Sequence, residues 1–437
     1  MRKLIFKPTF LKGLLQNIIS VIILILNKFL LVSIFLKELP TDTYGYWLYV
    51  VSFSSLWNMA NIGWNKSVIN HQILKYKNYD DSLLFFKSNI FFITIYSLLL
   101  FVIVSIISWF LNSDFSILLL TMLFYVFMNI PAKVIINQYI VKNKFYKSRL
   151  FLNIEEVFRV LLLISFLKLG FNIQYFGLCF LLPTLIIVIY IWFDNIAKSK
   201  VNLTIKTKFE YFKKSLNVTL NFFLQNISEV LYNESPILMI KENFILAKLP
   251  LYTTHKAIGN TLRSLFFMLN SVVAPEISHS AESKQNPLNI TFFFNLVCSS
   301  LIFVFIFFLV KYGDIIFDFW LGNTIVFDQK LFLLFLAVTV TGIYRSTNKM
   351  LLNATNTNKI YSRLEFLFII ILVILIFFYN FDVLYTIVEF IFYFEILVYF
   401  SGLYAIFCIY KYQSLKFIIS SLILISASLY EIKFLST

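Results

Sequence analysis

The sequence predicts an all-α polytopic membrane protein, with about twelve transmembrane helices in two six-helix bundles that form a pseudo-repeat. Apolar stretches of about 20 residues recur along the chain, which is the length that crosses the hydrocarbon core of a bilayer. The loops between these stretches are alternately rich and poor in Lys and Arg, as in an oriented membrane protein. The 437 residues are 60% hydrophobic and only 14% charged, so little of the chain remains for a soluble domain.

The predicted spans follow the apolar stretches in order. The first half gives 11–36, 43–64, 83–111, 115–140, 150–167 and 175–193, and the second half gives 216–240, 251–277, 288–310, 331–352, 364–381 and 384–410. The first span is too long for the apolar region of a cleavable signal peptide and lacks a small-residue cleavage site, so we expect it to stay. The last apolar stretch, 415–430, is short for a crossing, and we expect an interfacial helix there rather than a thirteenth span.

The distribution of basic residues predicts the orientation. Roughly 23 Lys and Arg residues fall in the N-terminal tail and the even-numbered loops, against about 6 in the loops of the other side, which places the N-terminus in the cytoplasm. Most of the Lys and Arg residues behind the formal net charge of +15 lie in this tail and these loops, so the charge is explained by membrane orientation. Because no basic arm or soluble module is present, nucleic-acid binding is excluded. We expect a multi-pass membrane protein with its N-terminus in the cytoplasm.

The longest hydrophilic stretch lies at the midpoint of the chain and predicts the domain organisation. We expect an N-terminal six-helix bundle at 1–195, a basic cytoplasmic linker at 196–215 and a C-terminal six-helix bundle at 216–411. Residues 412–437 form a C-terminal interfacial helix or an extra span.

The two halves also share short sequences in corresponding places. The tetrapeptide LQNI at 15–18 recurs at 224–227, and a Leu-Pro pair at 39–40, followed by a tyrosine, recurs at 249–250. Matching loop position and topology favour a parallel repeat of six helices, an arrangement common in transporters.

Several short segments carry a family resemblance. They are LPTDTYGYW at 39–47, NIGW at 61–64, PEIS at 275–278, FWLG at 319–322 and LLNATNTNK at 351–359. Their order and spacing over nearly the whole chain resemble bacterial polysaccharide repeat-unit flippases of the Wzx type. These flippases belong to the multidrug/oligosaccharidyl-lipid/polysaccharide (MOP) flippase superfamily.

The resemblance has two departures and several implications. Asn61 stands where the family often has an acidic residue, and Trp64 is bulkier than usual at its position. The resemblance implies two bundles around a central cavity that opens alternately to either side of the bacterial inner (cytoplasmic) membrane. The implied cargo is an undecaprenyl-pyrophosphate-linked oligosaccharide, moved from the cytoplasmic to the outer leaflet for O-antigen or capsule synthesis. The implied partners are this lipid-linked cargo, membrane lipid and, among proteins, a polysaccharide polymerase and a chain-length regulator. No cofactor is implied.

Ionisable residues inside the predicted spans are the candidate functional residues, because charges at membrane depth are costly and usually face a bundle interior or a watery cavity. The candidates for a substrate cavity are Lys28, Lys256, Arg263, Arg345 and Lys349. The candidates for ion coupling are Glu229 and Glu234. Cationic side chains would replace the water stripped from a pyrophosphate with charge-assisted hydrogen bonds.

Structural roles compete with these assignments. Arg345, Lys349 and Glu365 lie close enough to an interface to extend toward water. Lys28 with Glu229 or Glu234 would also serve as a buried ion pair between the two halves. Glu155, Glu156 and Arg159 form a charged end to the fifth span, where a pair between Glu155 and Arg159 at i,i+4 explains them as well as transport does.

The sequence disfavours an enzyme. It has no glycine-rich phosphate loop, no HExxH motif and no metal-ligand spacing among its three cysteines, so neither a catalytic residue nor a metal site is predicted. We expect the cysteines to be small core residues, and His71, His255 and His279 to lie at surfaces or interfaces. The alternatives are a drug/cation antiporter of the same superfamily and, with less support, a membrane polysaccharide polymerase or glycosyltransferase. The polymerase would need larger outward loops.

Overall fold

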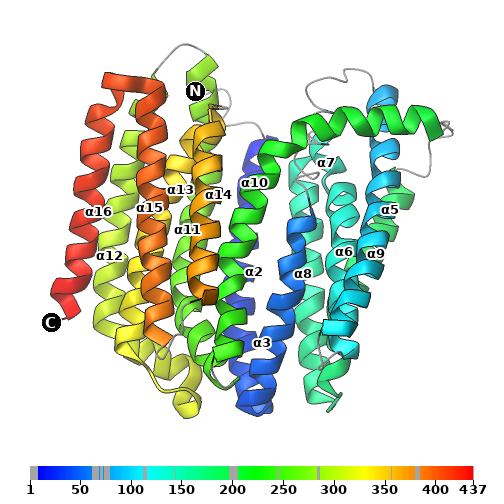
Figure 1. Ribbon diagram of the computed structural model, residues 1–437, viewed down its shortest axis with the longest axis horizontal. Helices are drawn as coiled ribbons and strands as arrows, with labels where there is room; N and C mark the ends of the chain where they lie inside the picture. The colour runs from blue at the N-terminus through cyan, green and yellow to red at the C-terminus, as the bar shows by residue number, and fades with distance from the viewer. Residues whose placement is uncertain are drawn as a thin grey trace. The chain divides into compact units, whose positions relative to one another are not determined.

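A computed structural model gives the fold (Figure 1). It describes residues 8–61, 68, 72, 79–111, 116–142, 144–195, 205–243, 246–282, 286–355, 357–378 and 384–436. All regular secondary structure in these residues is helical, as the sequence predicts. The chain divides into two compact units, one of residues 1–38 and 46–234 and the other of residues 39–45 and 235–437.

The first unit is built from helices that pack against their neighbours along most of their length. They are α2 (Pro8–Glu38), most of α3 (Thr41–Leu56), α5 (Tyr79–Leu111), α6 (Ile117–Ile136), α7 (Gln138–Val141), α8 (Phe145–Lys168), α9 (Leu178–Asn195) and the greater part of α10 (Ile205–Asn243). Helix α6 packs against both α5 and α9, and α8 packs against both α2 and α9. The core is aromatic, with Phe85, Phe86, Phe127 and Phe176 fully buried.

The second unit is organised around one central helix, α13 (Gln329–Ala354). This helix packs against α11 (Lys248–Glu282), α12 (Pro287–Leu321), α15 (Leu384–Tyr410) and α16 (Leu415–Ser436), while α14 (Lys359–Phe378) packs against α15. Asp328 caps α13, since its side chain accepts a hydrogen bond from the Leu331 amide at 3.0 Å. Helix α12 begins with Pro287 directly after its cap Asn286, where the missing amide hydrogen has no cost.

The predicted spans each coincide with a helix, although several helices are longer than predicted. Helix α10 begins at Ile205, so part of the predicted linker is helical, and residues 196–204 lie outside the described residues. The described chain contains 8 segments that are long and apolar enough to cross a membrane by length and composition. Helix α3 has only 16 residues, and α8, α10 and α11 carry charged residues inside their apolar stretches. The helices that look least membrane-like therefore include three that bear candidate functional residues.

The final helix is longer than the sequence suggests. α16 has 22 residues, against a predicted apolar stretch of about 16. At about 1.5 Å per residue this length matches a hydrocarbon core of about 30 Å. α16 packs along α12 and α13 in the second unit (Figure 1).

Two expectations about individual side chains are wrong. Cys179 and Cys298 are buried as predicted, but Cys408 is exposed. His255 is fully buried rather than interfacial, because its Nε2 accepts the Asp328 amide at 3.0 Å and its ring stacks on Phe327. His71 and the side chain of His279 lie outside what the structure describes.

Candidate functional site: buried charges in the two units

The second unit gathers three of the predicted cationic residues on two carboxylates. Arg263 comes from α11, and Arg345 and Lys349 come from adjacent turns of α13. Their partners are Glu395 on α15 and Glu365 on α14. We call these five residues the C-terminal charge cluster. The prediction that Arg345 and Lys349 extend to an interface is wrong, because both approach buried carboxylates instead.

Glu395 is the centre of this cluster. Its side chain is 0% exposed, and its two oxygens face two different arginines: Arg345 Nε lies 3.0 Å from Oε2, and Arg263 Nη1 lies 3.4 Å from Oε1. The arginine side chains are themselves only 9% and 13% exposed. A buried carboxylate requires such compensation, because an uncompensated charge in a dry interior is very costly. The ion pairs therefore tie α11, α13 and α15 together.

A glycine on α13 makes room for the Arg263 guanidinium. An added Cβ at Gly342 would lie 3.0 Å from the guanidinium carbon, which is closer than a side chain tolerates without displacement. Arg263 therefore lies across the backbone of α13. In the sequence, Gly342 is visible only as a glycine three residues before Arg345. Its role in making room for Arg263 can be recognised only when α11 and α13 are packed together.

The second pair of the cluster lies one turn along α13. Lys349 Nζ is 3.4 Å from Glu365 Oε1, and the Tyr361 hydroxyl donates to the same oxygen at 3.3 Å. Tyr361 and Glu365 share a face of α14 because they are four residues apart. These contacts are longer than those of Glu395 with Arg345, so Glu365 is held less tightly.

Uncharged polar side chains extend the interior around α13. Asn270 of α11 donates to the Ser346 hydroxyl at 2.9 Å. Asn348 is fully buried beside Gly402, and its amide nitrogen and oxygen both have no hydrogen-bond partner among the described residues. Buried amides are rarely left this way. The interior around α13 is therefore polar, unlike a helix surface that contacts lipid.

The remaining predicted residues are placed individually. Lys256 lies two turns before Arg263 on α11, with its ammonium 5.4 Å from the centroid of the Tyr252 ring. Glu229 is exposed and Glu234 is half-buried, both on α10. Lys28 lies on α2, but its side chain is outside what the structure describes, so the predicted pair with Glu229 or Glu234 stays a prediction.

The first unit has a charge cluster of its own, centred on Arg159 of α8. We call Glu155, Glu156 and Arg159 the N-terminal charge cluster. Its guanidinium lies 2.9 Å from Glu155 and 2.7 Å from Glu156, which confirms the predicted pair at i,i+4. The guanidinium also donates to the Tyr125 hydroxyl at 3.0 Å and lies over the Phe180 ring at 4.7 Å. The sequence missed these partners on α6 and α9.

Glu155 connects the N-terminal charge cluster to a third helix. The Thr184 hydroxyl of α9 donates to Glu155 Oε1 at 2.6 Å. Lys133 of α6 also interacts electrostatically with Glu155 and Arg159, so two cations balance two carboxylates in this cluster, whereas the C-terminal charge cluster has one cation in excess. Within the described residues, no group of three or more His, Cys, Asp or Glu side chains could hold a metal ion.

Comparisons with known proteins find the fold in solved membrane transporters. No protein-family model matches the chain, and no curated protein matches it. The structure of the lipid II flippase MurJ in an inward closed conformation is similar with a TM-score of 0.66 at 14% identity, covering 98% of this chain and 97% of that one. An outward-facing multidrug resistance MATE family transporter of the MOP superfamily gives 0.58 at 12% identity, covering 95% and 96%.

A third structure extends the similarity to an archaeal protein. A MOP superfamily transporter from Pyrococcus furiosus, described as having a binding pocket of reverse polarity, gives a TM-score of 0.53 at 12% identity, covering 89% of this chain and 94% of that one. The chain therefore has the fold of MOP-superfamily transporters, built from two pseudo-repeat helical bundles. The solved proteins with this fold include a multidrug transporter and a lipid II flippase.

Proposed function

We propose that this chain translocates undecaprenyl-pyrophosphate-linked oligosaccharide repeat units from the cytoplasmic to the outer leaflet of the inner membrane, for O-antigen or capsule synthesis. The observation that carries the proposal is the C-terminal charge cluster. Three cationic side chains from two adjacent helices meet only two carboxylates in a buried polar interior. An interior of this kind favours an anionic cargo over a cationic one.

The cluster suggests how a pyrophosphate is bound during transport. Glu395 and Glu365 supply counter-charge to Arg263, Arg345 and Lys349. Phosphate oxygens resemble carboxylate oxygens as acceptors for guanidinium groups. A pyrophosphate that enters would bind to the cation in excess, because three cationic side chains face two carboxylates, and both carboxylates would keep a cationic partner. Lys28 and Lys256 would extend the cationic surface.

Alternating access would be driven by an ion gradient sensed on α10. Glu229 and Glu234 lie on this long helix, in the stretch that the sequence predicts to span the membrane. A carboxylate at membrane depth binds a proton or Na⁺ to avoid the cost of an isolated charge. The N-terminus would lie in the cytoplasm. A polysaccharide polymerase and a chain-length regulator would then act on the cargo in the outer leaflet.

A drug/cation antiporter is the second candidate. Its support in the first unit is the pair of carboxylates Glu155 and Glu156, which would attract an organic cation. MATE transporters are among the proteins of similar fold. We rank this candidate below the flippase because most of the candidate residues inside the predicted spans are cationic.

Gene deletion distinguishes the candidates. We expect full-length lipid-linked repeat units to accumulate on the cytoplasmic side, with surface polymer lost. Normal polymer would contradict the flippase and favour the antiporter. Units that reach the outer leaflet but stay unpolymerised would point to a polymerase.

Complementation then tests the cationic residues. We expect Lys28→Ala, Lys256→Ala and Arg263→Ala to impair export at matched protein levels. Lys248→Ala, an exposed position on α11, is the control. Wild-type export by all three variants would remove these residues from the site.

A further inference from the structure

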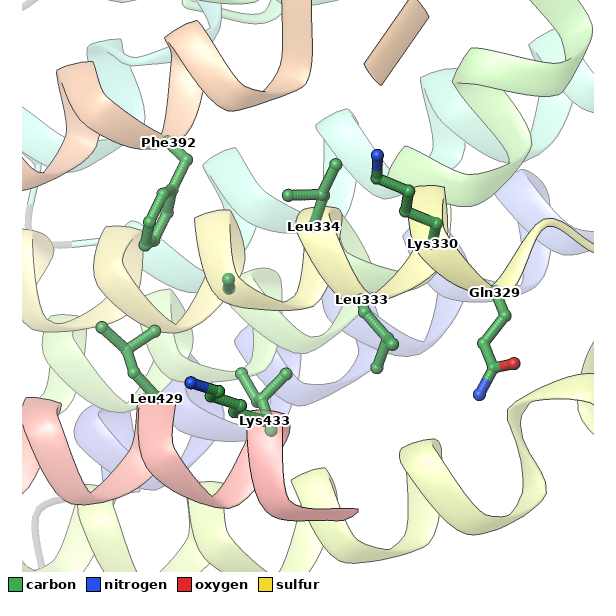
Figure 2. A pocket seen from close by; sticks show the side chains of 9 residues that line it. Gln329, Lys330, Leu333, Leu334, Phe392, Leu429 and Lys433 are labelled. Atoms are coloured by element: carbon green, nitrogen blue, oxygen red, sulfur yellow. The ribbon is translucent and has the colours of Figure 1, made fainter. Parts of the chain in front are cut away.

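A groove on the second unit has the features of a lipid-binding site. It has a volume of about 480 Å³ and is lined by residues of α13, α15 and α16. Figure 2 shows Leu333 and Leu334 on α13, Phe392 on α15, and Leu429 and Lys433 on α16 around this groove. The volume is in the range of small-molecule sites in proteins, about 300–1,000 Å³.

Exposed aromatic residues directly follow lining residues in the sequence of α15 and α16. Tyr393 is 61% exposed on α15, and Tyr430 and Phe434 are 68% and 65% exposed on α16. In a chain whose helices span a bilayer, exposed side chains of this kind face lipid, and aromatic residues near helix ends lie at the headgroup level. The groove therefore opens where its neighbour is membrane lipid.

The lining residues change from polar to apolar with depth. Gln329 and Lys330 lie in the first turn of α13, and Lys433 lies in the last turn of α16, so these polar groups share one end of the bundle. Ala337 lies two turns further along α13, about 10 Å from Lys330 at 1.5 Å per residue. On α16, Leu429 lies one turn deeper than Lys433. The gradient matches one lipid molecule, with its headgroup at the end and an acyl chain inside.

The polar end of the groove is cationic. Lys330 and Lys433 are both exposed and both line the groove, whereas neither of the neighbouring carboxylates, Asp328 and Glu431, is a lining residue. Asp328 is already engaged, because it caps α13 and accepts the Tyr385 hydroxyl at 2.5 Å. Lys330 lies over the ring of that tyrosine at 4.6 Å, which leaves its ammonium at the helix end. Two ammonium groups at this end form charge-assisted hydrogen bonds with a phosphate, so their charge is complementary to an anionic headgroup.

We infer that this groove binds an anionic phospholipid, with its phosphate at Lys330 and Lys433 and an acyl chain along Leu333, Ala337, Phe392 and Leu429. The site is separate from the C-terminal charge cluster, and it goes beyond the proposed transport. It gives α16 a function as one wall of a lipid site.

The test uses the full-length protein in detergent, titrated with phosphatidylglycerol or phosphatidylcholine of the same chain length and observed by native mass spectrometry. We expect phosphatidylglycerol to be retained in preference to phosphatidylcholine. Lys330→Gln combined with Lys433→Gln is expected to lower phosphatidylglycerol affinity by about tenfold or more. Lys311→Gln combined with Lys416→Gln removes the same charge from exposed positions outside the groove and is expected to leave affinity unchanged.

A second variant tests the apolar part. Ala337→Trp fills the groove while keeping both lysines, and we expect it to abolish phosphatidylglycerol retention. Equal binding of the two phospholipids, or an equal loss in the test and control pairs, would overturn the inference. Binding of undecaprenyl phosphate but not of phosphatidylglycerol would also overturn it, because the occupant would then be the lipid of the cargo. None of these outcomes depends on transport activity.

Discussion

Arg345 and Glu395 form a buried ion pair, with Nε of the arginine 3.0 Å from Oε2 of the glutamate. The pair joins α13, the central helix of the second unit, to α15. Since Arg263 faces the other oxygen of Glu395, the position of the carboxylate fixes two arginines at once. This coupling makes the cluster a structural support of the second unit.

Glu395→Gln is expected to destabilise the protein by about 3–5 kcal/mol, because two buried guanidinium groups lose their counter-charge. Thermal unfolding in detergent measures this. Glu389→Gln, on the same helix, makes the same chemical change away from the arginines and is the control. When Glu395→Gln and Arg345→Met are combined, the loss of stability should be smaller than the sum of the two single losses, since either change alone already breaks the ion pair. Equal unfolding temperatures for wild type and Glu395→Gln would contradict the assignment.

Gly45→Ala is expected to destabilise the protein by about 1–3 kcal/mol, because the added methyl group meets backbone that does not yield. An added Cβ at Gly45, in the first turns of α3, would collide with the carbonyl of Leu246. The direction of the stability change is what distinguishes a close contact from a helix-propensity effect. Alanine in a helix is ordinarily more favourable than glycine by about 0.5–1 kcal/mol. Stability measured for this variant and for Ser55→Ala in the same helix separates the two cases, and a stabilised Gly45→Ala protein would show that the contact yields.

Arg159→Lys is expected to cost about 1–3 kcal/mol of stability although the charge is kept. A lysine has no planar fork to reach Glu155, Glu156 and the Tyr125 hydroxyl together, and it loses the stacking on Phe180. Arg363→Lys, at an exposed position of α14, serves as the comparison. If both exchanges left the unfolding temperature unchanged, a single ion pair would be enough to hold α8.

The helices were predictable because membrane spanning is a local property of sequence. An apolar stretch of about 20 residues is recognised without knowing its neighbours. Pairing between Arg159 and Glu155 was predictable for the same reason, since residues four apart on one helix must meet. The family resemblance added the arrangement in two bundles, which the structural similarity to MOP-superfamily transporters confirms.

The partners of the buried charges were not predictable, because they come from distant helices. Arg263 and Glu395 are 132 residues apart in the chain. The sequence marked Arg263 as a candidate at membrane depth but gave it no partner. His255 failed for a related reason: its partner, the Asp328 amide, is 73 residues away, so the histidine looked interfacial. Contacts of this kind follow from packing, which a single sequence does not specify.

The last prediction concerns energy coupling on α10. If transport is coupled to a proton or Na⁺ gradient through Glu229 or Glu234, glutamine at both positions should abolish the response to an imposed gradient, because an amide binds neither cation as a carboxylate does. The measurement is uptake of a labelled lipid-linked oligosaccharide analogue in proteoliposomes with and without the gradient. Glu210→Gln, an exposed glutamate earlier on the same helix, controls for charge removal from α10. A double variant that transports as wild type does, with the same gradient dependence, would exclude both carboxylates as the coupling site. Attention would then move to Glu365, the buried carboxylate whose contacts, at 3.3 and 3.4 Å, are longer than those of Glu155.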